Sequence, residues 1–479
     1  MAATAAVRVA TPEIRWHCGP TGLNEAVLSL DFLPAAADDS GAVVLATGGA
    51  DKEIKLWRVR DALGDGAAAD DKSDKDDKED GEDAGEKEGG RGKGDAARGL
   101  EFVFSLSGHD RSVNCVRFSP NGEFLASASD DTSVILWTRP KTAGPDWRWD
   151  TVAALSDVAR TILSLGHKGD ITDLAWSPDS QFLCSTSIDN RSVIWHVGKG
   201  DVVERRKDHT QYVQGAAWDP LNEFVVTEGN DRTCRVYALG GFTRQTAGRK
   251  SGRKMTCVQT IKTREFPSTV DEEKQAEQDK PAASAAPQQS DSRPAPPKHR
   301  MFLDDTCPAF ARRPAWTPDG SYLLTPTGTF RATESAKAVN TVYAFARGDL
   351  SAPTLHLPGH DKASLAVRCS PLVYELRDGD KTGNFFQTNY RSVFAVVTLN
   401  AIVLYDTQQA HPICTVKDMH YADLTDASWS ADGQTLSVSS MDGYLSFIRF
   451  APGFFGTSLP PQSTFVTGHW QASLRGRSH

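Results

Sequence analysis

The stretch GHDRSVNCVRFSPNGEFLASASDDTSVILW, residues 108–137, decides the fold because its spacing recurs along the chain. It holds His109 near its start, Trp137 at its end and two short alternating runs between them. The interval from the His to the closing residue is 28 positions, and a fixed interval in otherwise dissimilar segments indicates a structural repeat. The same interval separates His167 from Trp195, His209 from Tyr237, and His420 from Ile448.

Each repeat unit has the pattern of three short strands that follow the His. Val113–Phe118, Phe124–Ser129 and Val134–Trp137 alternate or run apolar and are rich in β-branched and aromatic residues, which is typical of strands. An aromatic residue nine positions after the His precedes turn-forming residues, which predict a tight reversal between strands. A fourth strand comes from the stretch before each His. The sequence therefore predicts an all-β protein.

This spacing resembles the WD repeat of β-propellers, in which each unit forms one four-stranded blade. The Gly-His pairs that open WD units stand at 108–109, 166–167 and 359–360. The resemblance implies a seven-bladed WD-repeat β-propeller, closed by an N-terminal strand near Pro12–Trp16 that pairs beside Tyr444–Phe450, since ring closure removes exposed sheet edges. The third strands of the seven units end at Trp57, Trp137, Trp195, Tyr237, Phe345, Tyr405 and Ile448.

The WD pattern also implies what its recurring polar residues do. A buried Asp at a tight turn is costly unless it is hydrogen-bonded, and WD units link it to the His, a strand hydroxyl and the Trp indole N–H. A His-Asp-Ser set also fits a hydrolase, but its recurrence argues against one catalytic centre, so we expect structural networks and no enzyme activity. The last unit has Val438 and Ile448 in place of the hydroxyl and the Trp, which predicts an incomplete network. The predicted network residues are Thr47, Asp51 and Trp57; His109, Ser127, Asp131 and Trp137; His167, Ser185, Asp189 and Trp195; and His209, Thr227 and Asp231.

Composition indicates one propeller with two interruptions. The propeller is predicted to span residues 12–450, followed by a flexible C-terminal tail at residues 451–479. Residues 61–99 are charged, acidic on balance and poor in large apolar residues, whereas residues 265–298 are rich in Pro, Ala and Gln. Both compositions predict disordered insertions. They are either tolerated loops or, for the acidic one, a weak electrostatic contact with a basic partner.

The remaining composition argues against several classes of function. We expect no metal or cofactor, because the eight Cys lack CxxC spacing and no phosphate-binding glycine loop stands out. No apolar run is long enough to span a membrane, and the first residues lack the apolar core of a signal peptide. The formal net charge of −9 does not favour general or sequence-specific DNA binding. The basic stretch 243–255 fits a nuclear-localisation patch, a phosphate contact or a solvated hairpin.

Some stretches depart from the generic repeat in a particular way. MFLDDTCPAFARRPAWTPDGSYLLTPTG from residue 301, IRWH from residue 14 and LATGGADKEIKLW from residue 45 are similar to the WD-repeat subunit of chromatin assembly factor 1. The HIRA family of histone regulators shares parts of these motifs. The likeness covers most of residues 12–450, and Phe310–Pro314 is its most specific part.

The resemblance implies a nuclear, non-enzymatic scaffold subunit of a histone chaperone complex that deposits newly made histones H3 and H4 on DNA during replication-coupled nucleosome assembly. The implied partners are the large subunit of chromatin assembly factor 1, its histone-binding WD-repeat small subunit, the anti-silencing-function histone chaperone, and histones H3 and H4, directly or through companion subunits. The C-terminal tail departs from the family, because it has no match to the short basic-hydrophobic motif that binds that chaperone. The alternatives are HIRA-like replication-independent deposition and a WD adaptor of a ubiquitin ligase, although no F-box-like module precedes residue 12.

Partner-binding residues are predicted on the narrow face of the ring, where the residue before each turn Asp projects. Arg312 and Arg313 are further candidates because they break the generic pattern, although paired Arg residues equally fit bonds to neighbouring carboxylates. The predicted rim residues are Ala50, Asp130, Ile188, Asn230 and Met441, together with Arg111 and Tyr212 shortly after their His residues.

Overall fold

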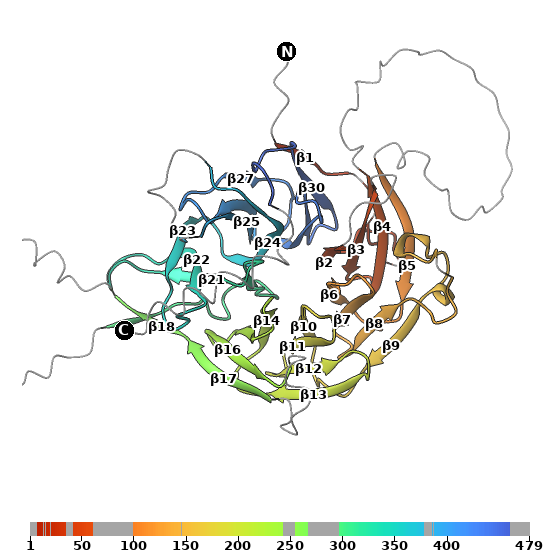
Figure 1. The fold of residues 1–479 in the computed structure, drawn as a ribbon, viewed down its shortest axis with the longest axis horizontal. Helices are drawn as coiled ribbons and strands as arrows, with labels where there is room; N and C mark the ends of the chain where they lie inside the picture. Colours follow the sequence, from red (N-terminus) through yellow and green to blue (C-terminus); the bar gives the residue numbers. More distant parts are fainter. Residues whose placement is uncertain are drawn as a thin grey trace, which may run out of the picture.

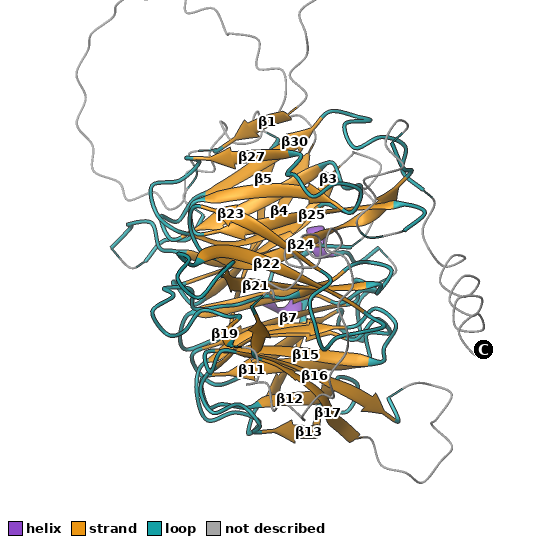
Figure 2. Ribbon diagram, turned by 90° about the vertical axis from the view of Figure 1, so that its left-hand side faces the viewer, coloured by secondary structure: helices purple, strands orange, loops and turns teal. Residues whose placement is uncertain are grey.

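The computed structural model describes residues 7–12, 14, 16–19, 21–34, 42–60, 99–144, 146–242, 254–266, 297–377, 386 and 388–459. These residues form seven four-stranded antiparallel sheets, which are arranged as the blades of a ring around a central axis (Figure 1). Figure 2 shows the ring from its side, with loops projecting from both faces. The predicted all-β, seven-bladed propeller is therefore confirmed.

Blades 1 to 4 follow one another along the chain, and each runs from its innermost to its outermost strand. Blade 1 contains β2 (Val27–Phe32), β3 (Ala42–Gly49), β4 (Glu53–Arg60) and β5 (Leu100–Ser107). Blade 2 contains β6 (Val113–Phe118), β7 (Phe124–Ser129), β8 (Val134–Thr138) and β9 (Ala159–Leu163). Blade 3 contains β10 (Ile171–Trp176), β11 (Phe182–Ser187), β12 (Ser192–His196) and β13 (Asp201–Arg206). Blade 4 contains β14 (Val213–Trp218), β15 (Phe224–Gly229), β16 (Thr233–Gly240) and β17 (Lys254–Ile261).

Blades 5 to 7 complete the ring. Blade 5 contains β20 (Ala315–Trp316), β21 (Tyr322–Phe330), β22 (Val339–Ala346) and β23 (Leu355–His360). Blade 6 contains β24 (Ser364–Tyr374), β25 (Arg391–Thr398), β26 (Ala401–Asp406) and β27 (Cys414–Lys417). Blade 7 contains β28 (Leu424–Trp429), β29 (Thr435–Ser440), β30 (Leu445–Phe450) and, at its outer edge, β1 (Val7–Ala10). Outside the blades lie the ribbon of β18 (Thr263–Glu265) and β19 (Lys298–Arg300) and the 3-10 helices η2 (Trp149–Thr151) and η3 (Leu155–Asp157).

Burial falls from the inner to the outer strand of a blade. The inner strands β6 and β14 are buried along their whole length, whereas the outer strand β13 is mostly exposed or half-buried. Apolar side chains gather between neighbouring blades, as where Ile54 and Leu56 of blade 1 meet Val113 and Trp137 of blade 2. The hydrophobic core is therefore divided among the blade interfaces, and each blade depends on its neighbours for burial.

The predicted turn residues reverse the chain between the first and second strands of a blade. Gly122 (φ 71°) and Asn222 (φ 60°) occupy the same turn position in blades 2 and 4, in the left-handed region that Gly and Asn adopt most readily. Their N–H groups donate to Ser119 and Asp219 carbonyls, each at 2.8 Å. The turn residues therefore set where these strands end and begin.

The strand that closes the ring lies earlier in the chain than predicted. β1 pairs with β30 from Val7 opposite Phe450, so the prediction of a closing strand at Pro12–Trp16 is wrong, and the propeller begins before residue 12. Trp16 is instead fully buried, with its ring centroid 4.4 Å from that of Trp57. A side chain of this size contributes more free energy inside the blade interface than at an exposed sheet edge.

The chain stays packed against the propeller after its last blade. Phe455 is 4% exposed, and the Leu459 N–H donates to the Val373 carbonyl at 2.8 Å. The prediction of a flexible tail from residue 451 is therefore wrong for residues 451–459.

Most of the two predicted insertions, residues 61–98 and 267–296, lies outside the described residues, as do residues 243–253 of the basic stretch. The ends of the second insertion are described. Glu265 and Lys298 pair at the end of the β18–β19 ribbon, so the predicted boundaries at these two residues are wrong.

Candidate functional site

The recurring polar residues form one hydrogen-bond network in each of blades 2, 3 and 4. In blade 2, His109 Nδ1 lies 2.8 Å from Asp131 Oδ2, and His109 Nε2 lies 2.8 Å from Ser127 Oγ. Trp137 Nε1 donates to the same hydroxyl at 2.9 Å. Equivalent contacts join His167, Asp189, Ser185 and Trp195 in blade 3, and His209, Asp231 and Thr227 in blade 4.

The hydrogen bonds of these networks hold a turn in place, and their geometry does not support the hydrolase alternative. Ser127 is fully buried and already accepts the Trp137 indole N–H, so its hydroxyl offers no access to a substrate. Asp131 accepts the N–H groups of Ser133 at 2.9 Å and Asp110 at 3.0 Å, which ties the turn to the segment that carries the His. Each network is confined to its own blade.

The network carboxylates are held in their charged form. Burial raises the pKa of Asp131 and Asp231, but the hydrogen bonds and charge of His109 and His209, together with the hydrogen bonds from Ser133 and Thr233, outweigh burial and hold both pKa values well below the usual range. The networks of blades 2 and 4 therefore keep their negative partner at neutral pH.

Blade 1 has a fourth complete network, whose His was not predicted as a member. His17 Nδ1 lies 2.6 Å from Asp51, His17 Nε2 lies 2.9 Å from Thr47 Oγ1, and Trp57 Nε1 donates to Thr47 at 3.1 Å. Here the His precedes its Asp by 34 residues instead of the 22 of blade 2, because both the segment from His17 to β2 and the connection from β2 to β3 are longer than in blade 2. Because of this longer interval, His17 does not fit the fixed spacing of the repeat.

Blade 7 replaces the missing hydroxyl with another residue, but Ile448 leaves its network without the indole N–H. The prediction of an incomplete network is therefore wrong only for the hydroxyl. Val438 stands where the hydroxyl is expected, and the Ser446 hydroxyl on the next strand lies 2.9 Å from His420 Nε2. Ser446 Oγ also lies 2.6 Å from Thr11 Oγ1, just beyond β1. The substitute network thereby links the two ends of the chain where the ring closes.

A cluster of five charged side chains fills the axis of the ring, and we name it the axial cluster: Arg117, Asp173, Arg313, Arg368 and Asp426. Arg313 Nε donates a hydrogen bond to Asp173 at 3.1 Å. Asp426 accepts hydrogen bonds from Arg117 at 2.8 Å and from Arg368 at 2.6 Å. Burial raises the pKa of Asp426, but the three arginines outweigh it and hold that pKa far below the usual range. The cluster connects the inner strands of blades 2, 3, 6 and 7 with the segment that precedes β20.

The two aspartates of the axial cluster were not predicted, although the sequence contains a pattern that indicates them. Asp173 in ITDLAW and Asp426 in LTDASW both stand three residues before the Trp of an inner strand. A repeated charge inside an otherwise apolar inner strand indicates a buried partner of opposite charge. Arg313 is that partner, since it is 1% exposed and contacts both carboxylates.

Arg312 is also buried and holds the segment before β20 in place. Its Nη2 donates to Asn230 Oδ1 at 2.9 Å, and its backbone N–H donates to the Gln214 carbonyl at 2.9 Å. Gly215 permits this approach, because a Cβ there would overlap the Arg312 carbonyl. Both guanidinium groups are buried, and the alternative of bonds to neighbouring carboxylates describes Arg313, so a partner contact of Arg312 or Arg313 stays a prediction.

A cavity of about 470 Å³ lies where the inner strands begin, and we name it the mouth cavity. Three predicted rim residues, Ala50, Asp130 and Met441, line it, and the structure thus brings them together from blades 1, 2 and 7. Phe310, in the segment that precedes β20, lines it as well. The rim residues that do not line it are Ile188, Asn230, Arg111 and Tyr212, of which Arg111 and Tyr212 are exposed.

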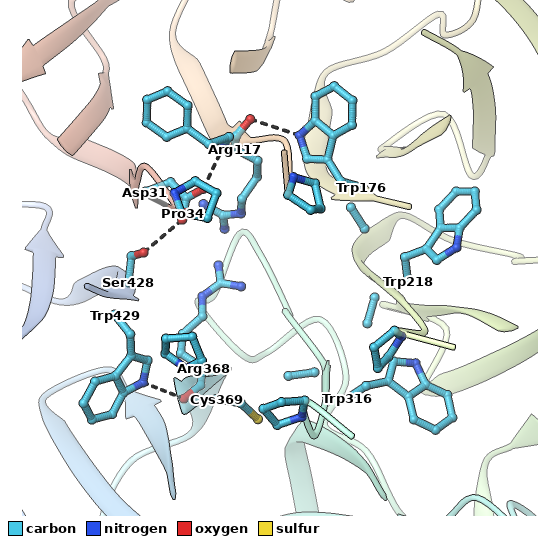
Figure 3. Close-up of a pocket in the computed structure, with 18 of the residues that line it drawn as sticks. Asp31, Pro34, Arg117, Trp176, Trp218, Trp316, Arg368, Cys369, Ser428 and Trp429 are labelled. Atoms are coloured by element: carbon cyan, nitrogen blue, oxygen red, sulfur yellow. Dashed lines mark hydrogen bonds between the residues drawn. The ribbon is translucent and has the colours of Figure 1, made fainter. Parts of the chain in front are cut away.

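A second cavity, of about 780 Å³, lies where the inner strands end, and we name it the funnel. Figure 3 shows the indoles of Trp176, Trp218, Trp316 and Trp429 around it, with Arg368 pointing toward its centre. Trp176 and Trp429 donate to the carbonyls of the preceding inner strands at 3.0 and 2.9 Å, which fixes their ring orientation. The axial cluster separates the funnel from the mouth cavity, because Arg117 lines the first and Arg313 lines the second.

The described residues present few reactive groups. Burial raises the pKa of Cys115 to about 11 and that of Cys184 to about 12, so both thiols stay protonated and unreactive. Within the described ranges, no three His, Cys, Asp or Glu side chains are placed to hold a metal ion. A membrane-spanning helix is likewise missing from the part of the chain that the structure describes.

A seven-bladed ring whose polar networks are structural, with a cavity at each end of its axis, defines a WD-repeat binding platform. The chain belongs to the family of CAF1B/HIR1 β-propellers, because the family model described as "CAF1B/HIR1 beta-propeller domain" matches residues 92–270 and 254–454.

Relatives that align with most of the chain support this assignment. The Chromatin assembly factor 1 subunit FAS2 homolog of Oryza sativa subsp. japonica is 36% identical over 446 residues, which cover 93% of this chain and 73% of the relative. A chromatin assembly factor 1 subunit of Gallus gallus is 34% identical over 95% of this chain and 69% of the relative. Protein HIR1 of Kluyveromyces lactis is more distant, at 24% identity over 87% of this chain and 41% of the relative.

Proposed function

We propose that this protein is a non-enzymatic scaffold subunit of chromatin assembly factor 1, the complex that deposits newly made histones H3 and H4 during replication-coupled nucleosome assembly. The observation that carries the proposal is the alignment of 93% of the chain, at 36% identity, with a relative named as a subunit of that factor. The site of action is then the nucleus.

The geometry of the ring supports a scaffold. The polar networks and the axial cluster use their charges internally, so the blades form a stiff platform. Both ends of the axis remain hollowed, with about 470 and 780 Å³ of space that partner segments can enter. The proposed partners are the large subunit, the histone-binding WD-repeat small subunit and the anti-silencing-function chaperone, with histones H3 and H4 held directly or through these subunits.

Reconstitution tests the proposal. The tagged chain is co-expressed with the large subunit of chromatin assembly factor 1, and complex formation is followed by gel filtration and cross-linking. We expect a stable complex that assembles nucleosomes on replicating DNA only when this chain is present. Recovery of a cullin complex instead, or replication-coupled assembly that proceeds equally well without the chain, would refute the proposed function.

The HIR1 relatives define the competing function, which is replication-independent deposition. The lower identity, 24% against 36%, favours the chromatin assembly factor 1 subunit. The same assembly reaction on DNA that is not replicating separates the two, because the proposed subunit is expected to add nothing there.

A further inference from the structure

We propose that the mouth cavity binds the side chain of an arginine or lysine from a partner protein. This inference rests on the proposed scaffold function and names the chemistry of one contact that the scaffold makes. The cavity volume of about 470 Å³ lies within the range of pockets that hold ligands. It is closed at its inner end by Arg313 of the axial cluster, so an entering side chain meets a floor.

The walls of the cavity carry carboxylates that the protein does not neutralise. Asp130, Asp170 and Asp423 line the cavity from blades 2, 3 and 7. Among the described residues, neither the Asp170 nor the Asp423 carboxylate has a hydrogen bond or an ion pair, whereas Asp130 accepts one bond from Asn114 at 2.5 Å. The mouth cavity therefore holds negative charge that a partner cation would balance.

The basic side chain that lines the cavity does not supply this cation. Arg313 is 1% exposed and donates to Asp173 at 3.1 Å and to the carbonyls of Thr425 and Asn114 at 3.0 and 3.1 Å. Its charge is committed to the aspartates of the axial cluster. Among the described residues, Asp170 and Asp423 thus stand at the mouth without an ion pair to an arginine, and Asp130 has only the charge of Arg111 at the rim nearby.

The electrostatics of Asp130 also favour a cationic ligand. Burial raises the pKa of Asp130 and repulsion from Asp170 raises it further, while the hydrogen bond from Asn114 and the weaker effect of Arg111 at the rim offset part of the rise. A carboxylate that a neighbouring carboxylate repels is stabilised by an incoming cation and destabilised by an incoming anion. The cavity therefore discriminates against acidic side chains.

Apolar residues at the same mouth fit the stem of a long basic side chain. Phe310 is 46% exposed and Met441 is 50% exposed, and both line the cavity. Arginine and lysine bury their methylene stems along apolar surfaces while their charged ends reach carboxylates, and an arginine also stacks on an aromatic ring. Exposed Phe and Met beside unpaired carboxylates match such a side chain better than a purely apolar or a small cationic ligand.

A labelled peptide tests the inference. The probe is fluorescein-labelled Gly-Ala-Arg-Ala-Leu-Arg-Ala-Gly, with Glu in place of both Arg residues as the peptide control, and binding to the full chain is followed by fluorescence anisotropy. We expect the basic peptide to bind and the acidic one not to bind. The double variant Asp130→Asn/Asp170→Asn is expected to raise the Kd about tenfold, the effect of losing a close charge pair.

Two further variants keep the test decisive. Asp146→Asn/Asp201→Asn removes the same charge from exposed positions outside the cavity, and we expect its Kd to match the unmodified chain. Asp423→Asn changes an exposed carboxylate without a hydrogen bond among the described residues, so it folds normally and is expected to raise the Kd about threefold. Equal loss in both double variants, an unchanged Kd in the cavity variants, or loss only after deletion of residues 61–98 would overturn the inference.

The test of the mouth cavity can fail independently of the test of the proposed function. Complex formation with the large subunit tests membership of chromatin assembly factor 1, and peptide affinity tests the mouth cavity. A chain that still assembles with the large subunit but whose cavity variants bind the peptide unchanged refutes this inference alone.

Discussion

Blades 2 and 5 occupy equivalent places in the ring but are held by different interactions. In blade 2, Ser127 lies nine residues after Phe118 and contacts both His109 and Trp137. In blade 5, Thr325 lies nine residues after Trp316, is equally buried, and its hydroxyl has no partner among the described residues. Blade 5 therefore has a hydroxyl at the network position, but this hydroxyl does not form a network.

Contacts between blades replace the missing network of blade 5. Its inner strand β20 has two residues, and the preceding Arg312 and Arg313 extend it toward both neighbours. Arg312 N–H donates to the Gln214 carbonyl of blade 4, and Arg313 N–H donates to the Leu365 carbonyl of blade 6, each at 2.9 Å. The comparison teaches that a blade can lose its internal fastener when a buried segment joins its neighbours instead.

Replacing Arg313 is expected to have the largest effect on stability. Arg313→Met leaves Asp173 and Asp426 buried with one cation fewer, and breaking a buried ion pair in this way costs about 3–5 kcal/mol. Urea unfolding followed by tryptophan fluorescence measures the loss. The exposed Arg111→Met serves as the control and is expected to change stability by less than about 0.5 kcal/mol. A loss for Arg313→Met as small as that of the control would show that the axial cluster does not hold blade 5.

The two equivalent hydroxyls of blades 2 and 5 provide the next test. Ser127→Ala removes the atom that contacts His109 Nε2 and Trp137 Nε1, and leaving buried polar groups unpaired costs about 1–3 kcal/mol. Thr325→Val removes a hydroxyl without a partner in the described structure, so we expect stability unchanged or raised by about 0.5 kcal/mol. Thermal unfolding of both variants, scored against the unmodified chain, checks the difference. Equal losses would mean that Thr325 has a partner after all, and loss of an activity at normal stability in Ser127→Ala would favour catalysis.

The sequence predicted the regular blades well because their residues act within one repeat. His109, Ser127 and Asp131 lie at fixed intervals, and a fixed interval is visible in a single chain. Gly122 and its turn are equally local, so the strand boundaries of blade 2 could be placed by turn chemistry.

The features that the sequence did not reveal depend on residues far apart in the chain. Arg313 lies 140 positions from Asp173, and the repeated Asp of the inner strands indicates a buried cation without showing which residue supplies it. The resemblance to WD propellers predicts an N-terminal closing strand but does not fix its position, and Trp16 of the predicted strand Pro12–Trp16 packs in the interior. The mouth cavity combines residues of several blades, so Asp130 and Met441 were found as rim residues but Asp170 and Asp423 were not.

The boundary between blades 4 and 5 contains a third effect on stability, which depends on pH. Glu228 of blade 4 is fully buried and accepts a hydrogen bond from the Thr327 hydroxyl of blade 5, and burial raises its pKa to about 8. The pKa in the unfolded chain is near the ordinary 4.5, so the folded state holds this proton more tightly. The contribution to stability is therefore full below about pH 4.5 and is lost as the pH rises through about 8.

Glu228→Gln keeps an amide in the place of the protonated carboxyl and removes the titration. We expect the Tm of the variant to equal or fall slightly below that of the unmodified chain at pH 5, and to exceed it at pH 9, where the buried carboxylate of the unmodified chain is ionised. Calorimetry across this pH range measures the difference, with the exposed Glu334→Gln as the matched control. A Tm difference that stays constant with pH, or that favours the unmodified chain at pH 9, would show that Glu228 is ionised in the folded protein and that Arg312 neutralises it across the blade boundary.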